Sequence, residues 1–226
     1  MIVLGLTGSI AMGKSTAASM FRRLGVPVFD ADRSVHRHLA ANGRAIAAVA
    51  AAFPGVARNG RIDRAVLAAA VFGDDDALAR LEAILHPLVH ADQERFLRIA
   101  ARHGERLVVL DVPLLFETGW ERHCDAVAVV SAPLFVQMQR LKARPGMDRE
   151  RLETTLARQT PDAEKRRRAD YVIPTGRSRG ETMRVIARIV RELRAETAAP
   201  RRQRGRRRRA APGGAGHASR AKSTVQ

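Results

Sequence analysis

The stretch GLTGSIAMGKST, residues 5–16, decides the fold of this 226-residue chain. It matches the pattern G-x-x-x-x-G-K-S/T, with Gly8, Gly13, Lys14 and Ser15 at the fixed positions. A loop of this composition curls until its backbone N–H groups face an anion, and glycine permits the torsion angles that the curl needs. An apolar strand precedes the loop and a helix is expected after it, which adds the positive end of a helix to the site. The stretch therefore predicts a phosphate-binding loop, with an ordinary glycine turn as the competing interpretation.

Two side chains of the loop supply charge and metal ligation. Lys14 is expected to place its ammonium on the β and γ phosphates of a nucleotide, and the Ser15 hydroxyl to ligate Mg²⁺. The chain has 36 arginines and four lysines, so a lysine at this position is informative. We therefore expect ATP and Mg²⁺ as cofactors, with the nucleotide bound by Gly8, Ala11, Met12, Gly13, Lys14, Ser15 and Thr16.

Ala11 occupies a loop position where glycine is expected. If the backbone is right-handed there, alanine is harmless. If the loop needs a positive φ, alanine costs about 1–2 kcal/mol. The sequence leaves both possibilities open.

The composition is that of one α/β domain with room for an insertion. Hydrophobic residues make up 46% of the chain, enough to fill a core. The single cysteine, Cys124, excludes an internal disulfide framework and fits a reducing compartment. No apolar run approaches the roughly 20 residues of a membrane-spanning helix, and the N-terminal MIVLGL lacks the basic residues of a signal peptide. We expect a cytoplasmic protein with no membrane partner.

Basic charge is concentrated at the C-terminus. The formal net charge is +17, and residues 197–226 contribute nine of those charges without one acidic residue. This segment has almost nothing to bury, so we expect an arginine-rich disordered tail. Weak contact with nucleic acid or anionic lipid is one interpretation. A solvated extension is favoured, because the segment lacks the aromatic residues that stack on bases.

Apolar runs alternate with helical patterns along the first 196 residues. The apolar runs predict strands at residues 2–7, 26–30, 107–111, 126–130 and 171–174. The helical patterns predict helices at residues 14–24, 33–53, 62–72, 75–102 and 133–142, with 75–102 interrupted at His86-Pro87, and a closing helix that starts at Ser178 with Glu181 in a capping box. The alternation predicts an α/β fold of the P-loop NTPase class, a three-layer αβα arrangement around a five-stranded parallel sheet, with helical insertions over its C-terminal edge.

The rest of the chain narrows the class of P-loop protein. A GTPase would carry a guanine-reading N-K-x-D sequence, which the chain lacks. Helicases and transporters need larger cores. A short chain with helical insertions suits a kinase of a small metabolite, which needs a base for the acceptor hydroxyl, Mg²⁺, and cationic side chains on a lid.

Aspartates mark the ends of two predicted strands. Asp30 and Asp32 lie at the end of the second strand, at the edge where α/β folds bind ligands. One can accept the proton of the acceptor hydroxyl while the other caps the next helix, and we assign the catalytic role to Asp32. Asp111 ends the run LVVLD, where it can bind Mg²⁺ or form a turn.

Two arginines and a histidine are further candidates. Arg140 and Arg144 lie four residues apart, on one face of a helix that runs into a Pro-Gly break. They are expected on the nucleotide phosphates, unless they belong to a solvated helix face. His86 can pair with a substrate phosphate or carbonyl, or can serve as a structural residue before Pro87.

Seven segments, spread over residues 1–196, together resemble the dephospho-CoA kinase family. They are GLTGSIAMGKST, VFDADRSVHRHL, GRIDRAVLAAAVFGD, LEAILHPLV, DVPLLFETG, QRLKAR and ADYVI. The Asp-Ala-Asp, the His-Pro and the PLLFE are specific to this family among P-loop kinases. The resemblance implies transfer of the ATP γ-phosphoryl group to the ribose 3′-hydroxyl of dephospho-CoA, the last step of coenzyme A synthesis.

The resemblance also implies residue roles and a domain layout. Asp32 becomes the expected base, Lys14 and Arg140 the phosphate cations, and His86, Pro113 and Leu114 the residues on the acceptor side. The implied kinase domain, residues 1–196, has a core of residues 1–32, 105–140 and 169–196, a helical substrate domain at about 33–104 and a lid at about 141–168. We expect a monomer or a weak oligomer.

Two other functions stay open at this point. One is a P-loop kinase that acts on a nucleoside or a small acid. The other is a nucleic-acid-binding protein that uses the basic tail, with the phosphate loop unused. Dependence of ADP release on dephospho-CoA separates the first from our interpretation, and salt-dependent binding that vanishes with residues 197–226 would mark the second.

Overall fold

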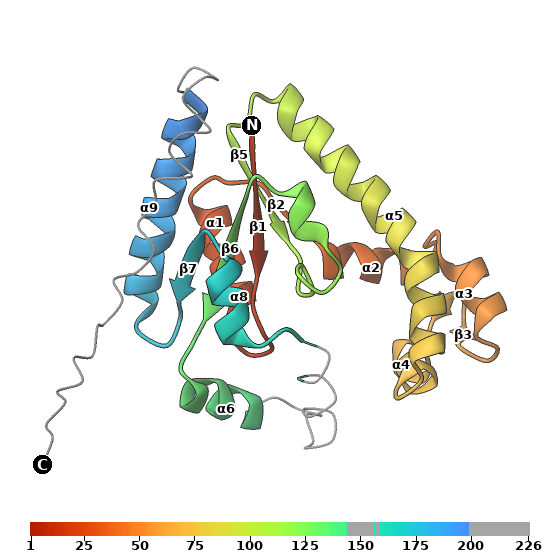
Figure 1. Ribbon diagram of the computed structural model, residues 1–226. Coiled ribbons are helices and arrows are strands. Elements are labelled where there is room, and N and C mark those ends of the chain that lie inside the picture. Colours follow the sequence, from red (N-terminus) through yellow and green to blue (C-terminus); the bar gives the residue numbers. More distant parts are fainter. Residues whose placement is uncertain (144–155, 157–158, 199–226) are drawn as a thin grey trace, which may run out of the picture.

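Five parallel strands form the centre of the molecule, as the sequence predicts (Figure 1). The computed structural model describes residues 1–143, 156 and 159–198. The strands lie in the order β2-β5-β1-β6-β7. Their bounds are Ile2–Thr7 for β1, Val28–Asp30 for β2, Leu107–Asp111 for β5, Ala126–Ser131 for β6 and Tyr171–Pro174 for β7. Every residue of β5 and β6 is buried, which fits a parallel sheet covered on both faces.

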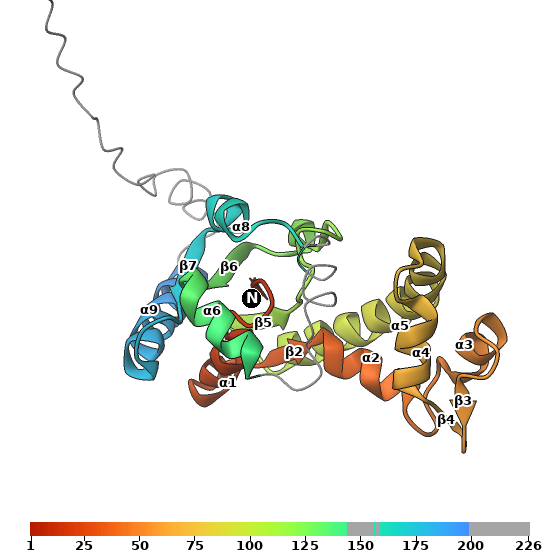
Figure 2. The same cartoon turned by 90° about the horizontal axis from the view of Figure 1, so that it is seen from below.

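Helices cover both faces of the sheet and complete three layers (Figures 1 and 2). On one face, α1 (Lys14–Arg23) packs beside α9 (Arg179–Ala198). Their apolar residues share a buried cluster with β1, β6 and β7. On the other face lie the second half of α5 (Asp75–Arg102), the short 3₁₀ helix η1 (Trp120–His123) and α8 (Asp162–Arg168).

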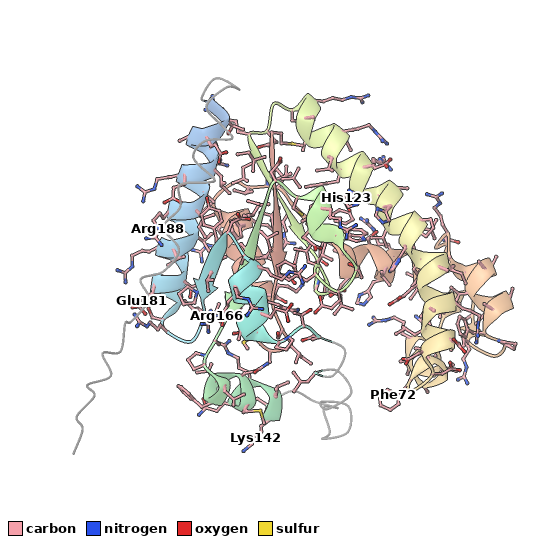
Figure 3. All side chains as sticks on the ribbon, in the orientation of Figure 1. Phe72, His123, Lys142, Arg166, Glu181 and Arg188 are labelled. Carbon is pink, nitrogen blue, oxygen red and sulfur yellow. The ribbon has the colours of Figure 1, made fainter. Side chains whose placement is uncertain are left out.

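Helix α9 shows how the sequence pattern produces this layering. The predicted capping box is confirmed, because Ser178 Oγ accepts from the Glu181 backbone N–H at 3.2 Å and Glu181 Oε2 accepts from the Ser178 N–H at 3.2 Å. Ile186, Ile189 and Leu193 are buried against the sheet. Glu181 and Arg188 point away from it (Figure 3).

The register of the strands brings the candidate site together at one edge. In the parallel ladders, Leu6 of β1 pairs with Asp111 of β5, and Asp30 of β2 pairs with the same Asp111. The carboxyl ends of β1, β2 and β5 therefore lie side by side, where open α/β sheets bind their ligands.

The segment between β2 and β5 builds a helical unit with its own core. It contains α2 (Ala31–Leu39), α3 (Ile46–Ala52), the hairpin β3–β4 (Ala57–Arg58 and Arg61–Ile62), α4 (Arg64–Val71) and the first half of α5. Its buried cluster consists of Leu39, Ala45, Val49, Phe53, Val56, Ile62, Leu67, Ala77, Leu81 and Leu85.

The predicted interruption at His86-Pro87 is wrong, because α5 runs unbroken through Pro87 for 28 residues. A proline removes one N–H from the helix ladder. Leu81 and Leu85 before it and Val89 after it are all buried, so the apolar face of the helix continues across the proline. We infer that packing of this face outweighs the lost hydrogen bond.

The helix predicted over residues 33–53 is divided into α2 and α3. Asn42 adopts a φ of 63°, and a Cβ on Gly43 would overlap the carbonyl group of His38 and lie 2.7 Å from the Ala40 carbonyl oxygen. A second Asn-Gly pair turns the β3–β4 hairpin, with φ angles of 49° at Asn59 and 69° at Gly60. Asn-Gly is the local signal for both turns.

None of the helices in the described part of the chain has a stretch long and apolar enough to cross a membrane.

The close approach at Gly43 predicts the effect of adding one methyl group. Gly43→Ala should lower the free energy of unfolding, measured in urea, by about 1–3 kcal/mol, because backbone atoms must move apart. The control is Gly180→Ala in the first turn of α9, where the nearest atom to a new Cβ is Ser178 Oγ at 3.9 Å. That variant should be unchanged or more stable by up to about 1 kcal/mol. Equal stability of both variants would contradict the packing at Gly43.

Candidate active site

The predicted phosphate-binding loop connects β1 to α1 and contains two positions that need glycine. Gly13 has a φ of 89°, and its carbonyl accepts from Ala17 N at 3.1 Å in the first turn of α1. A Cβ on Gly8 would lie 2.7 Å from the Val130 carbonyl oxygen of β6. The first glycine therefore lets the loop approach the sheet, and the second lets the chain turn into the helix.

Three consecutive carbonyl groups of the loop are bound from outside it. Gln137 Nε2 of α6 (Leu134–Lys142) donates to the Ile10 carbonyl at 2.9 Å. Arg140 Nη1 donates to the Ala11 carbonyl at 3.3 Å. Thr175 Oγ1, just after β7, donates to the Met12 carbonyl at 2.5 Å.

These contacts fix the direction of the loop amides. In a trans peptide, a carbonyl and the following N–H point in opposite directions. With the Ile10 and Met12 carbonyls bound by Gln137 and Thr175, the N–H groups of Ala11 and Gly13 point away from those two side chains. That is the arrangement that binds an anion.

Ala11 adopts a φ of 60°, so its backbone is left-handed. Of the two possibilities that the sequence leaves open, the loop takes the one that costs an alanine about 1–2 kcal/mol.

Lys14 and Asp111 form an ion pair at the floor of the loop. Lys14 Nζ lies 2.6 Å from Asp111 Oδ1, which is buried at the end of β5. Burial raises the pKa of Asp111, although the neighbouring Lys14 ammonium acts to lower it. A cation and a carboxylate thus lie together beside the loop, as a site for phosphate and a metal ion requires.

Asp30 and Asp32 have different environments. Asp30 Oδ1 accepts from the Arg33 backbone N–H at 2.9 Å and so caps α2, which confirms that one of the two aspartates caps this helix. Asp32 is exposed in the first turn of α2. Within the part of the chain that the structure describes, its carboxylate has no hydrogen bond or ion pair with another residue.

Two neighbouring cavities meet at Asp32 and Pro113. The larger, of about 730 Å³, contains the phosphate loop, and we call it the donor cavity. The predicted residues on its walls are Gly8, Ala11, Met12, Gly13, Lys14, Ser15, Thr16, Asp32, Pro113 and Arg140.

The smaller cavity, of about 270 Å³, lies between α2, α5 and the loop after β5, and we call it the acceptor pocket. Apolar side chains form most of it, including Leu81, Leu85 and Val89. The predicted residues on its walls are Asp32, His86, Pro113 and Leu114. The Pro113 carbonyl accepts from Thr7 Oγ1 at 2.8 Å, which ties the wall between the cavities to the end of β1.

Arg140 and Arg144 have different outcomes. Arg140 lines the donor cavity, but among the described residues its guanidinium contacts the Ala11 carbonyl and Thr175: Nη2 lies 2.6 Å from the Thr175 carbonyl. Arg144 lies outside the described residues. The interpretation of both as phosphate cations stays a prediction.

Sequence reasoning missed the polar residues that support the loop. Gln137, Thr175 and Gln159 contact residues 10–12 across 127, 163 and 149 positions of the chain. Lys165, one of the four lysines, is fully buried beside Glu117. Lysine is rare in this arginine-rich chain, and that rarity was the sequence feature that could have marked Lys165 as important.

Comparison with known proteins decides between the classes of P-loop kinase. The sequence model of the family described as dephospho-CoA kinase matches residues 2–179. The chain belongs to the dephospho-CoA kinase family. It is 63% identical to the dephospho-CoA kinase of Paramagnetospirillum magneticum over 166 residues, which are 74% of this chain and 78% of the relative. It is 54% identical to that of Mesorhizobium japonicum over 196 residues, which are 87% and 98% of the two chains.

The fold comparison agrees with this membership. A crystal structure of a protein from Thermus thermophilus superposes with a TM-score of 0.73 and 36% identity, covering 84% of this chain and 96% of that one. The family match confirms the enzyme class that the sequence resemblance implies, a dephospho-CoA kinase that acts in the last step of coenzyme A synthesis. As a kinase, the chain uses ATP.

The left-handed backbone at Ala11 predicts that glycine is the better residue there. Ala11→Gly should raise the free energy of unfolding by about 1 kcal/mol, because relief of the strain exceeds the added entropy of the unfolded chain. Ala17→Gly, at a buried position of α1, is the control and should lower it by about 1 kcal/mol. Urea denaturation measures both. A loss of stability in Ala11→Gly would show that the left-handed conformation carries no cost.

Proposed function

We propose that the chain transfers the γ-phosphoryl group of ATP to the ribose 3′-hydroxyl of dephospho-CoA, with the two cavities holding the two substrates. The observation that carries this assignment is that the donor cavity and the acceptor pocket share Asp32 and Pro113. A carboxylate at the junction is within reach of both the transferring group and the hydroxyl that receives it.

On the donor side, backbone and cationic groups would bind the nucleotide phosphates. The N–H groups of Ala11 and Gly13 point away from the side chains that bind the preceding carbonyls. Those of Lys14, Ser15 and Thr16 belong to the first turn of α1, where N–H groups have no partner within the helix. The Lys14 ammonium adds a full charge beside them, and Arg140 supports the loop from outside.

Mg²⁺ would be held by Ser15 and Asp111. Both offer oxygen, the donor atom that Mg²⁺ prefers, and Asp111 lies next to Lys14 at the end of β5. In the described residues no three His, Cys, Asp or Glu side chains group to hold a metal, so phosphate oxygens and water would complete the coordination. When bound, the ion neutralises charge on the transferring phosphoryl group.

Asp32 would act as the base. The 3′-hydroxyl oxygen forms the new bond to the γ-phosphorus, the bond from that phosphorus to the β–γ bridging oxygen breaks, and ADP leaves. The proton of the hydroxyl passes to the Asp32 carboxylate, which is exposed and has no other partner among the described residues.

The acceptor pocket would hold the rest of dephospho-CoA. Its apolar walls suit the uncharged parts of that substrate, with His86 as a polar group and Pro113 and Leu114 on the side of β5. In the proposed layout, residues 33–104 are the substrate domain and residues 141–168 the lid. Residues 144–155 and 157–158 of that segment lie outside the described residues.

The first prediction of this proposal concerns the acceptor. With purified enzyme and Mg²⁺-ATP, ADP release in a coupled assay should depend on dephospho-CoA, and the product should be coenzyme A by mass spectrometry. Nucleosides and shikimate at the same concentration should give no ADP above background. Absence of ADP release with dephospho-CoA, or equal release with a nucleoside, would overturn the proposal.

The second prediction concerns the base. Asp32→Asn should lower kcat by about 10²–10⁴-fold, because the amide cannot accept the proton, while ATP affinity by calorimetry stays within a few fold. Asp30→Asn is the matched control, since asparagine caps a helix as well as aspartate does. The control should retain most of the activity. Equal turnover of Asp32→Asn and the parent would refute the assignment.

A further inference from the structure

A lysine and a glutamate form a buried ion pair beside the site. The proposed mechanism does not use this pair. The Lys165 side chain of α8 is 0% exposed, and its Nζ lies 2.9 Å from Glu117 Oε1, in the loop between β5 and η1. Removing both charges from water is costly, and such a pair is weak evidence for stability. A role in positioning other groups is therefore worth testing.

The ion pair also positions the short segment of residues 160–165. Glu117 Oε1 also accepts from the Thr160 backbone N–H at 2.7 Å. Burial alone would raise the pKa of Glu117, but the adjacent Lys165 ammonium and the hydrogen bond from the Thr160 N–H lower it below its usual value, so the carboxylate is charged at neutral pH. Thr160 directly follows Gln159, and Pro161 caps the helix that carries Lys165. Glu117 therefore fixes both ends of residues 160–165.

Gln159 connects this segment to the phosphate loop. Its Oε1 accepts from the Ile10 backbone N–H at 3.0 Å, and its side chain lines the donor cavity together with Lys14 and Arg140. Because Ile10 N–H is a donor, the atom that faces it must be the amide oxygen. The amide nitrogen then projects from the other side of the group with two N–H donors, which have no acceptor among the described residues.

We propose that Gln159 donates a hydrogen bond to the phosphate oxygens of the bound nucleotide, and that the buried Glu117–Lys165 pair is the positioning element that sets Gln159 on the phosphate loop. The proposal deepens the function proposed above and rests on it for the identity of the reaction, but not for nucleotide binding. Glu117 follows Pro113 and Leu114 in the same loop, so one loop lines the acceptor pocket and braces a donor-side residue.

The first experiment measures nucleotide binding without an acceptor. Binding of the Mg²⁺ complex of the non-hydrolysable ATP analogue AMP-PNP is followed by calorimetry. Gln159→Ala should weaken it about 10- to 100-fold, as expected for one lost hydrogen bond to a charged group. Gln159→Glu keeps the acceptor for Ile10 but replaces the donors with a negative charge, so it should weaken binding further. Affinities of both variants within twofold of the parent would overturn the role of Gln159.

The second experiment tests the positioning role of the Glu117–Lys165 pair with variants that can fold. Glu117→Leu/Lys165→Met removes both charges together, which avoids leaving one charge buried alone. It also removes the acceptor for Thr160 N–H, so AMP-PNP affinity and kcat should fall to the level of Gln159→Ala. Glu117→Gln/Lys165→Met restores an acceptor and should recover most of both values. Glu121→Gln is the control, because it removes the negative charge from the 2.8 Å pair with Arg168 of the same helix without touching Gln159.

Non-additivity separates positioning from a structural role. If Glu117 acts through Gln159, adding Gln159→Ala to Glu117→Leu/Lys165→Met should cost less than twofold more. Fully additive losses of AMP-PNP affinity would overturn the positioning role of the Glu117–Lys165 pair. A Glu117→Leu/Lys165→Met variant with a lower melting temperature but parental affinity and kcat would overturn it as well. If the parent binds AMP-PNP but transfers nothing to dephospho-CoA, the proposed function fails, while the loss of affinity in Gln159→Ala still supports the present inference.

Discussion

Hydrogen bonds from distant segments to three carbonyl groups of the phosphate loop are the constraint on which the site depends. Gln137, Arg140 and Thr175 bind the carbonyls of residues 10–12, and they come from α6 and from the end of β7. An anion site made of backbone amides works only if the amides keep their direction before the anion arrives. The sheet supplies that order, because it fixes α6 and β7 relative to β1.

The same edge of the sheet explains how one fold serves two substrates. The register that pairs Asp30 with Asp111 sets the end of β2 beside the end of β5, so the first turn of α2 faces the loop after β5. Asp32 and Pro113 belong to these two elements and separate the donor cavity from the acceptor pocket. Membership in the dephospho-CoA kinase family gives these neighbouring cavities a chemical interpretation.

The sequence predicts local features well and distant contacts poorly. The phosphate loop, the five strands, and the caps at Asp30 and Ser178 follow from short patterns of residue type, and the structure bears them out. The unbroken course of α5 was not predicted. The rule that proline disfavours helix at the preceding residue considers only neighbouring residues, whereas burial of α5 in two cores keeps the helix intact. Gln137 and Thr175 look like ordinary polar residues in the sequence. Their contacts with the loop appear only when the sheet brings distant segments together.

The length of α5 has a mechanical consequence. At 28 residues it is roughly 42 Å long, and it contributes Leu81 and Leu85 to the core of the helical unit and Val89 to the core on the sheet. The helix therefore belongs to the helical unit and to the sheet at once. Any hinge motion between these two parts would have to unpack one of the two cores. Because α5 forms one wall of the acceptor pocket, the position of this pocket relative to the sheet is set by the packing of α5. On the proposed assignment of the two cavities, donor and acceptor would be brought together by side chains and loops and not by movement at α5.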